Sequence, residues 1–293
     1  ATVFNKGYSE SNDVIACISN GTDSIVKEVT KEVESVYLPH AVPTDFFKPM
    51  PQEAIDTLKK KQGLEDKFIF FWNNRNARRK QSGTLIYWFK KFCDKVGNDK
   101  CVLVMHTDPN DPYGQPLEHL IHHFGANEGQ IRLSRQKVGP EELAAMYNMA
   151  DCTLNISDAE GFGLATLESL SCGTPIIATM TGGLQEQVTD GENWFGIGIE
   201  PASKALIGSQ QVPYIFEDRI SEEDFINALE TMYKMKKEDR EEMAKMGRDH
   251  VNKNYSFEKY QENWVKLFDE TYEKHGSWQD RKSYSPWVLK KIN

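Results

Sequence analysis

The chain has 293 residues, 39% of them hydrophobic, which is enough for one large or two smaller α/β domains with buried cores. Its formal net charge of −9 argues against a nucleic-acid partner, because phosphate binding needs a clustered cationic surface. The 5 cysteines are scattered and form no C-x-x-C pair, so they indicate neither a disulfide framework nor a zinc site.

Two features bear on where the protein resides. The scattered cysteines without a disulfide pattern fit a reducing compartment, and the start of the chain can be compared with a secretion signal. The sequence begins at Ala1 and enters structured-looking sequence at once, so we expect a fragment or a processed chain. No stretch resembles a signal peptide, and no apolar run approaches the ~20 residues that cross a bilayer. The sequence therefore predicts a cytoplasmic protein without a transmembrane segment.

The first part of the chain predicts a short βαβ unit. We expect a strand at residues 13–19 ("DVIACIS"), a helix at 22–35 and a strand at 35–42 ("SVYLPHAV"). The segment "HAVPTDFFKPMPQ" then contains three prolines, which cannot continue a helix or a central strand. Residues 43–66 are therefore predicted to be a linker.

A regular alternation of strands and helices begins at residue 67. Strands are expected at residues 67–74, 101–107, 130–134, 152–157 and 174–179. Helices are expected at residues 82–96, 117–124, 140–149, from about 162, and at 184–188. This pattern predicts an α/β fold with a doubly wound parallel sheet of about six strands.

The last part of the chain is expected to be helical. A helix begins after Ser221, with Asp224 completing a variant of the capping box. Aromatic residues then recur at near-helical spacing, at Tyr255, Phe257, Tyr260, Trp264, Phe268 and Tyr272. We expect this stripe to pack on the core, with carbohydrate binding as the alternative, and "SPWVLKKIN" (285–293) to form a final helix.

The stretch "DAEGFGLATLESLSCGTPIIAT" (158–179) contains two carboxylates beside a glycine-rich turn. Ligands of an open parallel sheet bind beyond the carboxyl ends of its strands, where this turn is expected to lie. Gly161 and Gly163 lack Cβ atoms, and a helix beginning near Phe162 offers free N–H groups to an anion. Glu160 and Glu168 can face the same cleft and accept hydrogen bonds from sugar hydroxyls. The alternative is a capped amphipathic helix with solvated glutamates.

The segment E-G-F-G-L-x-x-x-E, from Glu160 to Glu168, resembles the E-x7-E signature of retaining glycosyltransferases of the GT-B fold. Among these it is most similar to family 4, the glycosyl transferases group 1. "EELAAMYNMADCTLNIS", "CGTPIIAT" and "GGLQE" resemble further motifs of that family in the same order. "VYLPHAVPTDFFKP" resembles the segment that joins its two Rossmann-like domains, so the resemblance covers roughly residues 10 to 260.

The resemblance implies a division of the chain. Residues 67–250 would be the Rossmann-like domain that binds the nucleotide-sugar donor. Residues 1–42 would be the last βαβ piece of the N-terminal acceptor domain, a remnant of a second Rossmann-like domain. Residues 251–293 would form C-terminal helices that pack back toward it. With most of the acceptor domain missing, the chain alone is expected to bind donor and to turn over poorly or not at all.

A cationic loop, "RNARRK", follows the first strand of the donor domain. Arg75 and Lys80 match the arginine and lysine that hold the donor pyrophosphate in the family, where a planar donor fork and a mobile charge bind phosphate oxygens. "NNRN" replaces the glycine that often precedes the arginine, so Arg78 or Arg79 could share this role. A solvated charged surface is the alternative.

The family holds the nucleobase near the end of "IRLSRQKV", which makes Arg135 and Lys137 candidates for donor contacts. His106 and Thr107, at the end of the strand "CVLVMHT", are expected to face the same crevice. Nothing in these residues distinguishes uridine from guanosine or adenosine.

The implied reaction moves a hexosyl group from a nucleotide diphosphate sugar to an acceptor hydroxyl with retention, without metal or cofactor. Arg75, Lys80 and the amides near Gly163 and Leu164 would stabilise the leaving diphosphate. Glu160 would hold sugar hydroxyls, and Glu168 would accept from the ribose hydroxyls.

Other functions and partners stay open at this point. A noncatalytic nucleotide-sugar-binding module and a phosphorylase or epimerase of the same architecture are the alternatives. The acceptor, whether glycan, lipid or protein, and contact with a membrane surface through the missing domain are not determined.

Overall fold

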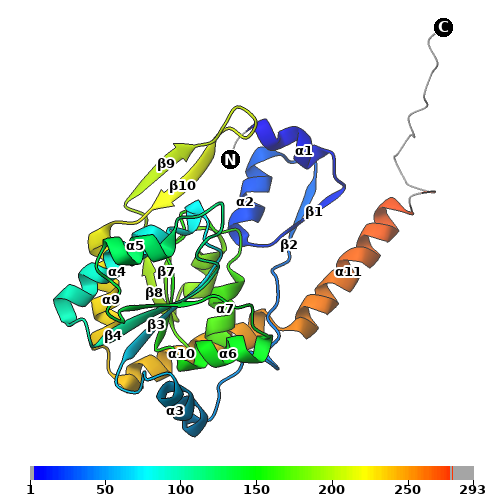
Figure 1. Cartoon of the computed structure of the whole chain (residues 1–293). Helices are drawn as coiled ribbons and strands as arrows, with labels where there is room; N and C mark the ends of the chain where they lie inside the picture. The colour runs from blue at the N-terminus through cyan, green and yellow to red at the C-terminus, as the bar shows by residue number, and fades with distance from the viewer. Residues whose placement is uncertain (1–2, 278, 280–293) are drawn as a thin grey trace.

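Six strands form one parallel sheet in the computed structural model, which describes residues 3–277 and 279 (Figure 1). The strands are β3 (Phe68–Asn73), β4 (Cys101–His106), β5 (Ile131–Ser134), β6 (Cys152–Asn155), β7 (Ile176–Thr179) and β8 (Gly196–Ile199). Their order in the sheet is β5-β4-β3-β6-β7-β8, so the chain changes direction across the sheet between β3 and β6. The predicted doubly wound parallel sheet is confirmed, and its switch point is where such folds bind ligands.

Helices cover both faces of this sheet. The α-helices of this part of the chain are α4 (Ser82–Val96), α5 (Leu117–His123), α6 (Pro140–Met149), α7 (Leu164–Ser171), α8 (Gln185–Val188), α9 (Glu222–Lys234) and α10 (Lys237–Asn254). The 3-10 helices η2 (Arg78–Lys80) and η3 (Gly182–Leu184) precede α4 and α8. Helices α4, α5 and α9 contribute to the core on one face, and α6, α7 and α10 to the core on the other.

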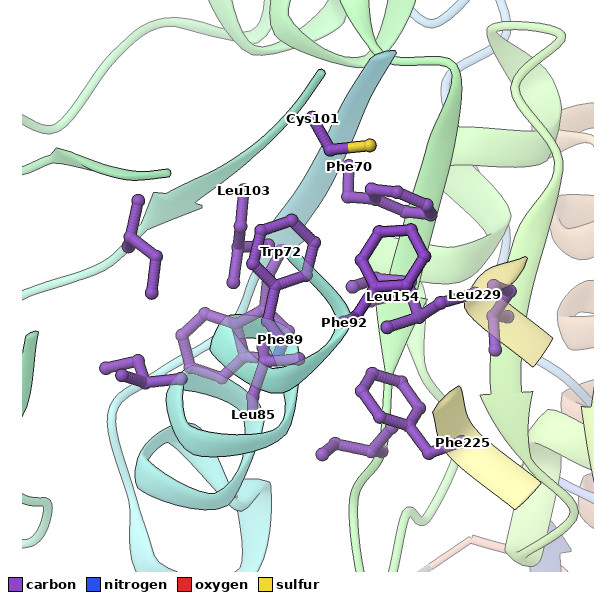
Figure 2. Close-up of a cluster of buried hydrophobic side chains, with 14 of the residues drawn as sticks. Phe70, Trp72, Leu85, Phe89, Phe92, Cys101, Leu103, Leu154, Phe225 and Leu229 are labelled. Atoms are coloured by element: carbon purple, nitrogen blue, oxygen red, sulfur yellow. The ribbon is translucent and has the colours of Figure 1, made fainter. Parts of the chain in front are cut away.

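The central strand β3 separates the two cores. Phe70 and Trp72 belong to one core and Ile69 and Phe71 to the other, because successive side chains of a strand point to opposite faces. Figure 2 shows the first core, in which the Phe70 ring of β3 lies against Phe89 and Phe92 of α4 and Phe225 of α9 belongs to the same cluster. The Phe70 ring centroid lies 5.6 Å from that of Phe89. Each fully buried side chain of this kind contributes about 1.5–3 kcal/mol.

The predicted N-terminal βαβ unit is present as a separate two-stranded parallel sheet. It contains η1 (Val3–Asn5), α1 (Lys6–Glu10), β1 (Val14–Cys17), α2 (Asn20–Val29) and β2 (Glu34–Tyr37). The expected helix end at residue 35 was wrong. The Thr30 backbone is already extended, and its buried hydroxyl donates to Glu10 at 2.7 Å, which turns the chain toward β2.

The region that was expected to be a linker contains α3 (Gln52–Lys61), which packs against α6. Pro51 occupies the N-cap position, where a proline does not interrupt a helix. The prolines therefore mark where this helix begins, and the charged sequence after them is helical.

An antiparallel hairpin that the sequence did not reveal follows β8. It consists of β9 (Ser203–Ile207) and β10 (Ile215–Arg219). In Figure 1 it rises beside the N-terminal βαβ unit. Its loop is long and contains no two-residue turn signal, so neither strand was recognised.

The C-terminal helix α11 (Phe257–His275) is present, but its aromatic stripe does not pack on the core as expected. The Phe268 and Tyr272 side chains are exposed by 62% and 64%. Only part of the stripe is buried, because α11 runs along the small N-terminal unit, where Lys274 Nζ lies 2.6 Å from the Glu34 carboxylate. The final helix that was expected at 285–293 lies outside the described residues.

Within residues 3–277 and 279, every helix is too short or too polar to cross a membrane.

Candidate functional site

A cleft of about 710 Å³ lies between the N-terminal βαβ unit and the carboxyl edge of the large sheet. Four segments form most of its walls, namely the start of α2, the loop from β6 to α7, the segment of Thr181, Gly182 and Gln185, and the β9–β10 hairpin. The loop contributes Glu160 and Gly161, and Arg79 of η2 lies next to them. The E-G-F-G turn and the cationic loop, both predicted from the sequence to bind the donor, thus border the same cleft at the switch point of the sheet.

Glu160, which lines the cleft, forms a nearly buried ion pair with Lys80, which does not itself line it. Their side chains are exposed by 9% and 10%, and the Lys80 ammonium donates directly to the Glu160 carboxylate. Burial lowers the pKa of Lys80, and the charge of Glu160 partly offsets this effect. The Arg79 guanidinium donates to the Ala159 carbonyl at 2.6 Å and lies 3.7 Å from the Glu160 carboxylate. Two of the predicted cations, Arg79 and Lys80, therefore meet the carboxylate that was expected to hold sugar hydroxyls.

The structure does not bring Arg75 to Glu160. The Arg75 guanidinium is 60% exposed and forms a two-point pair with Asp111, with Nε 2.6 Å from the carboxylate. It also lies 4.8 Å from the centre of the Tyr113 ring. The pair raises the pKa of Arg75 and lowers that of Asp111. Arg75 must leave Asp111 if it is to reach a diphosphate at the cleft.

Arg78 binds the hairpin through Glu217. Both Glu217 oxygens accept from the Arg78 guanidinium, at 2.5 and 2.9 Å, and Arg219 donates to the same carboxylate at 2.9 Å. Arg219 also lies 3.0 Å from Asp158, which precedes the E-G-F-G turn. These ion pairs fix the base of the hairpin to the cationic loop.

We expect Glu217→Gln to lower the free energy of unfolding by about 1–2 kcal/mol at neutral pH, because a buried charge-assisted contact is weakened. The hydrogen bonds from Arg78 lower the pKa of Glu217 below its ordinary value of 4.5. The stabilisation is therefore complete above that value and is lost as the pH falls through the lowered pKa. Urea unfolding at a series of pH values measures the difference in the free energy of unfolding between wild type and variant. Glu241→Gln, at an exposed pair on α10, is the control; a difference that persists unchanged at pH 3 contradicts this assignment.

The "GGLQE" segment supports the backbone of the E-G-F-G turn. The Gly183 amide donates to the Glu160 carbonyl at 3.3 Å, and a Cβ atom at Gly182 would lie 1.7 Å from that oxygen. Gln187 donates to the Phe162 carbonyl at 2.7 Å. The predicted donor-binding Phe162 has its ring in the core, 4% exposed, so only its backbone can contact a donor.

The last residue of this motif, Glu186, connects the two parts of the chain. Its carboxylate accepts from the Asn20 amide at 2.9 Å and from the Tyr37 hydroxyl at 3.0 Å. Sequence reasoning recognised the motif but not this contact, because the partners lie 166 and 149 residues away.

Helix α7 begins at Leu164, two residues later than the expected start near Phe162. Gly163 has φ +98°, a conformation that glycine adopts readily, and among the described side chains none caps the first turn. The Thr166 amide donates to the Gly163 carbonyl at 3.2 Å, which leaves the Leu164 and Ala165 amides for an anion, and the helix dipole favours negative charge there.

Glu168 lies on α7 behind the turn and contacts Tyr147 of α6. The Tyr147 hydroxyl donates to the Glu168 carboxylate at 2.7 Å and accepts from Asn73 at 2.8 Å. Burial raises the pKa of Glu168, which the hydrogen bond from Tyr147 opposes. Sequence reasoning missed Tyr147 and Asn73, although Asn73 stands at the carboxyl end of β3.

The proposed nucleobase region lies at the carboxyl ends of β4 and β5. His106 Nδ1 is 2.9 Å from the Ser134 hydroxyl, and burial lowers the pKa of this histidine. The Thr107 amide donates to the Ser134 carbonyl at 3.0 Å. Arg135 pairs with Glu118, and Lys137 lies exposed in the loop after β5.

No group of three or more His, Cys, Asp or Glu side chains in the part of the chain that the structure describes is placed to hold a metal ion.

A parallel Rossmann-like sheet whose switch point faces a second βαβ unit across a cleft is the architecture of GT-B glycosyltransferases. The model of the family "Glycosyl transferases group 1" matches residues 54–250. The chain belongs to this family.

Similar proteins agree with this assignment. GDP-mannose-dependent alpha-(1-6)-phosphatidylinositol monomannoside mannosyltransferase of Mycolicibacterium smegmatis is 29% identical over 163 residues, 53% of this chain and 41% of the relative. N-acetyl-alpha-D-glucosaminyl L-malate synthase of Bacillus anthracis is 26% identical over 231 residues, 76% of this chain and 56% of the relative. The chain thus spans about half the length of these curated relatives.

Among solved structures, the chain resembles Anabaena HepE in complex with UDP and glucose. The TM-score is 0.72 with 14% sequence identity, over 92% of this chain and 68% of that chain. At this identity the likeness concerns the fold.

Proposed function

We propose that the chain is the donor-binding portion of a retaining, metal-independent hexosyltransferase that uses a nucleotide diphosphate sugar. The observation that carries this proposal is the buried Lys80–Glu160 pair at the cleft, beside the uncapped first turn of α7. It unites a cation for phosphate and a carboxylate for sugar hydroxyls in one place.

The chemistry follows from where charge develops. When the bond between sugar and diphosphate breaks, negative charge grows on the diphosphate and positive charge on the sugar ring. Lys80, Arg79 and the amides at the start of α7 would stabilise the negative charge on the diphosphate. Glu160 would hold sugar hydroxyls and the developing ring charge, and Glu168 would accept from the ribose. Arg75 would join the diphosphate after leaving Asp111.

The names of similar proteins support the donor class. One relative is GDP-mannose-dependent and the Anabaena structure contains UDP and glucose, so the diphosphate is shared while the base differs. We therefore assign the diphosphate to this chain and leave the base and the acceptor to experiment.

We also propose that residues 67–250 form the donor domain, that residues 1–42 belong to the acceptor domain, and that residues 43–66 connect them. Residues 251–293 would return toward the first domain. The contacts of Lys274 with Glu34 and of the Val42 amide with the Tyr255 carbonyl, at 3.0 Å, support this division.

Calorimetry with UDP, GDP and ADP tests the proposal. We expect at least one nucleotide to bind, and Glu168→Ala to weaken its binding about tenfold, because one charge-assisted hydrogen bond is lost. Arg75→Ala combined with Lys80→Ala should weaken it about a hundredfold. Lys237→Ala with Lys266→Ala removes the same charge from exposed helix positions and should have little effect. Absence of binding to all three nucleotides would refute the assignment.

A further inference from the structure

The two faces of the β9–β10 hairpin have different surroundings. Cross-strand partners share a face, so the pairs Phe216 with Leu206 and Asp218 with Lys204 lie on the same side. Glu217 and Arg219 lie on the other side, where they are tied to Arg78 and Asp158. One face of the hairpin therefore anchors it, and the opposite face, on which Asp218 pairs with Lys204 and accepts from Thr181, borders the cleft.

This second face of the hairpin forms a wall of the cleft that contains Glu160. Lys204, Phe216 and Asp218 line it, and the Phe216 ring is 50% exposed. Ile25 of α2, 48% exposed, lines the same cleft from the N-terminal unit. Two large apolar side chains from separate elements thus border a space that is otherwise lined by polar groups.

The polar lining restricts what can occupy this space. Ser19 and Thr22 of the α2 end carry hydroxyls, and the Asp218 carboxylate accepts from Thr181 at 2.6 Å. A wholly apolar ligand would desolvate these groups without replacing their hydrogen bonds. A pyranose ring has an apolar C–H face and a rim of hydroxyls, which matches both kinds of lining.

We infer that Phe216 and Ile25 form an acceptor subsite for a saccharide, with one pyranose ring on the Phe216 face and its hydroxyls toward Thr22 and Asp218. The inference rests on the proposed function, because the cleft must also hold the donor at Lys80 and Glu160. A cleft of about 710 Å³ has room for two sugar rings. The β9–β10 hairpin then determines which acceptor saccharide binds.

Ligand-observed NMR on the whole chain tests this subsite. The protein is saturated with whichever of UDP, GDP or ADP binds in calorimetry. Saturation transfer is then measured to the methyl α-glycosides of glucose, mannose, galactose and N-acetylglucosamine, with 1-hexanol as an apolar probe. We expect transfer to the ring C–H protons of at least one glycoside, and binding of that glycoside about three- to tenfold weaker in Phe216→Ala.

Two further variants separate a ligand contact from a folding defect. Ile215→Ala alters the neighbouring residue, which faces away from the cleft, and should leave glycoside binding unchanged. Phe216→Trp should retain it. Equal behaviour of Phe216→Ala and Ile215→Ala, transfer to 1-hexanol alone, or no transfer to any glycoside while the nucleotide binds would overturn the inference. Failure of every nucleotide to bind would instead refute the proposed function on which it rests.

Discussion

Lys80→Met is expected to lower the free energy of unfolding by about 3 kcal/mol, because it leaves the Glu160 carboxylate in a nearly buried position without its cation. Arg79 remains within 3.7 Å of the carboxylate and its side chain is 45% exposed, so it can compensate only in part. Urea unfolding at neutral pH, with the slope compared between variants, measures the loss.

A second substitution distinguishes the ion pair from packing effects. Glu160→Gln combined with Lys80→Met removes the unpaired charge while keeping similar side-chain volume, so most of the lost stability should return. Nucleotide binding should stay impaired in the double variant, because the cation for the diphosphate is absent. Equal stability of Lys80→Met and the double variant would contradict this account, because the unpaired Glu160 carboxylate would then carry no cost; the Glu160→Gln single variant completes the cycle that gives the coupling energy.

The parts of the fold that the sequence predicted are those with strong local patterns. Buried parallel strands such as β3 and β4 are nearly continuous apolar runs, and the helices between them are amphipathic, so both were recognised. Strand β8 reads "GIGI" and was not named, since its two glycines give no strand signal. Local patterns therefore predict the sheet and most of its strands.

The candidate site could be predicted in its main chain but not in its side-chain pairs. The E-G-F-G turn, the cationic loop and their position at the edge of the sheet follow from motif order and topology. The partners of the cations do not, since Arg78 meets Glu217 139 residues away and Arg75 meets Asp111 36 residues away. Spacing along the sequence carries no information about such contacts, and only the folded hairpin and loops bring them together.

The exposed aromatic residues of α11 show that periodic spacing does not predict what a helix packs against. The periodic stripe of α11 has the spacing of a core-facing helix, but a helix packs only where a partner surface exists. In the described chain α11 runs beside a two-stranded unit, and Phe268 remains exposed. A periodic pattern indicates an amphipathic helix, and the partner of its apolar face must come from the structure.

Gly182→Ala is expected to be the most damaging single substitution considered for the site. Gly182 has φ +50°, and an added Cβ atom would lie 1.7 Å from the Glu160 carbonyl oxygen, a backbone atom that no rotamer change can move. We expect a loss of at least about 4 kcal/mol, which combines backbone strain with the displacement of the Glu160 main chain. Urea unfolding measures the stability, and calorimetry with the bound nucleotide measures the effect on the site.

Gly191→Ala supplies the matched control. Gly191 has φ +96°, yet nothing lies within 4 Å of an added Cβ atom, so only the strain of about 1–2 kcal/mol applies. The difference between the two variants isolates the collision with the Glu160 backbone, and Gly191→Ala should keep its nucleotide affinity. Similar losses in both variants would show that the turn around Gly182 can relax. The close contact between the "GGLQE" segment and the E-G-F-G turn would then not be what holds Glu160 at the cleft.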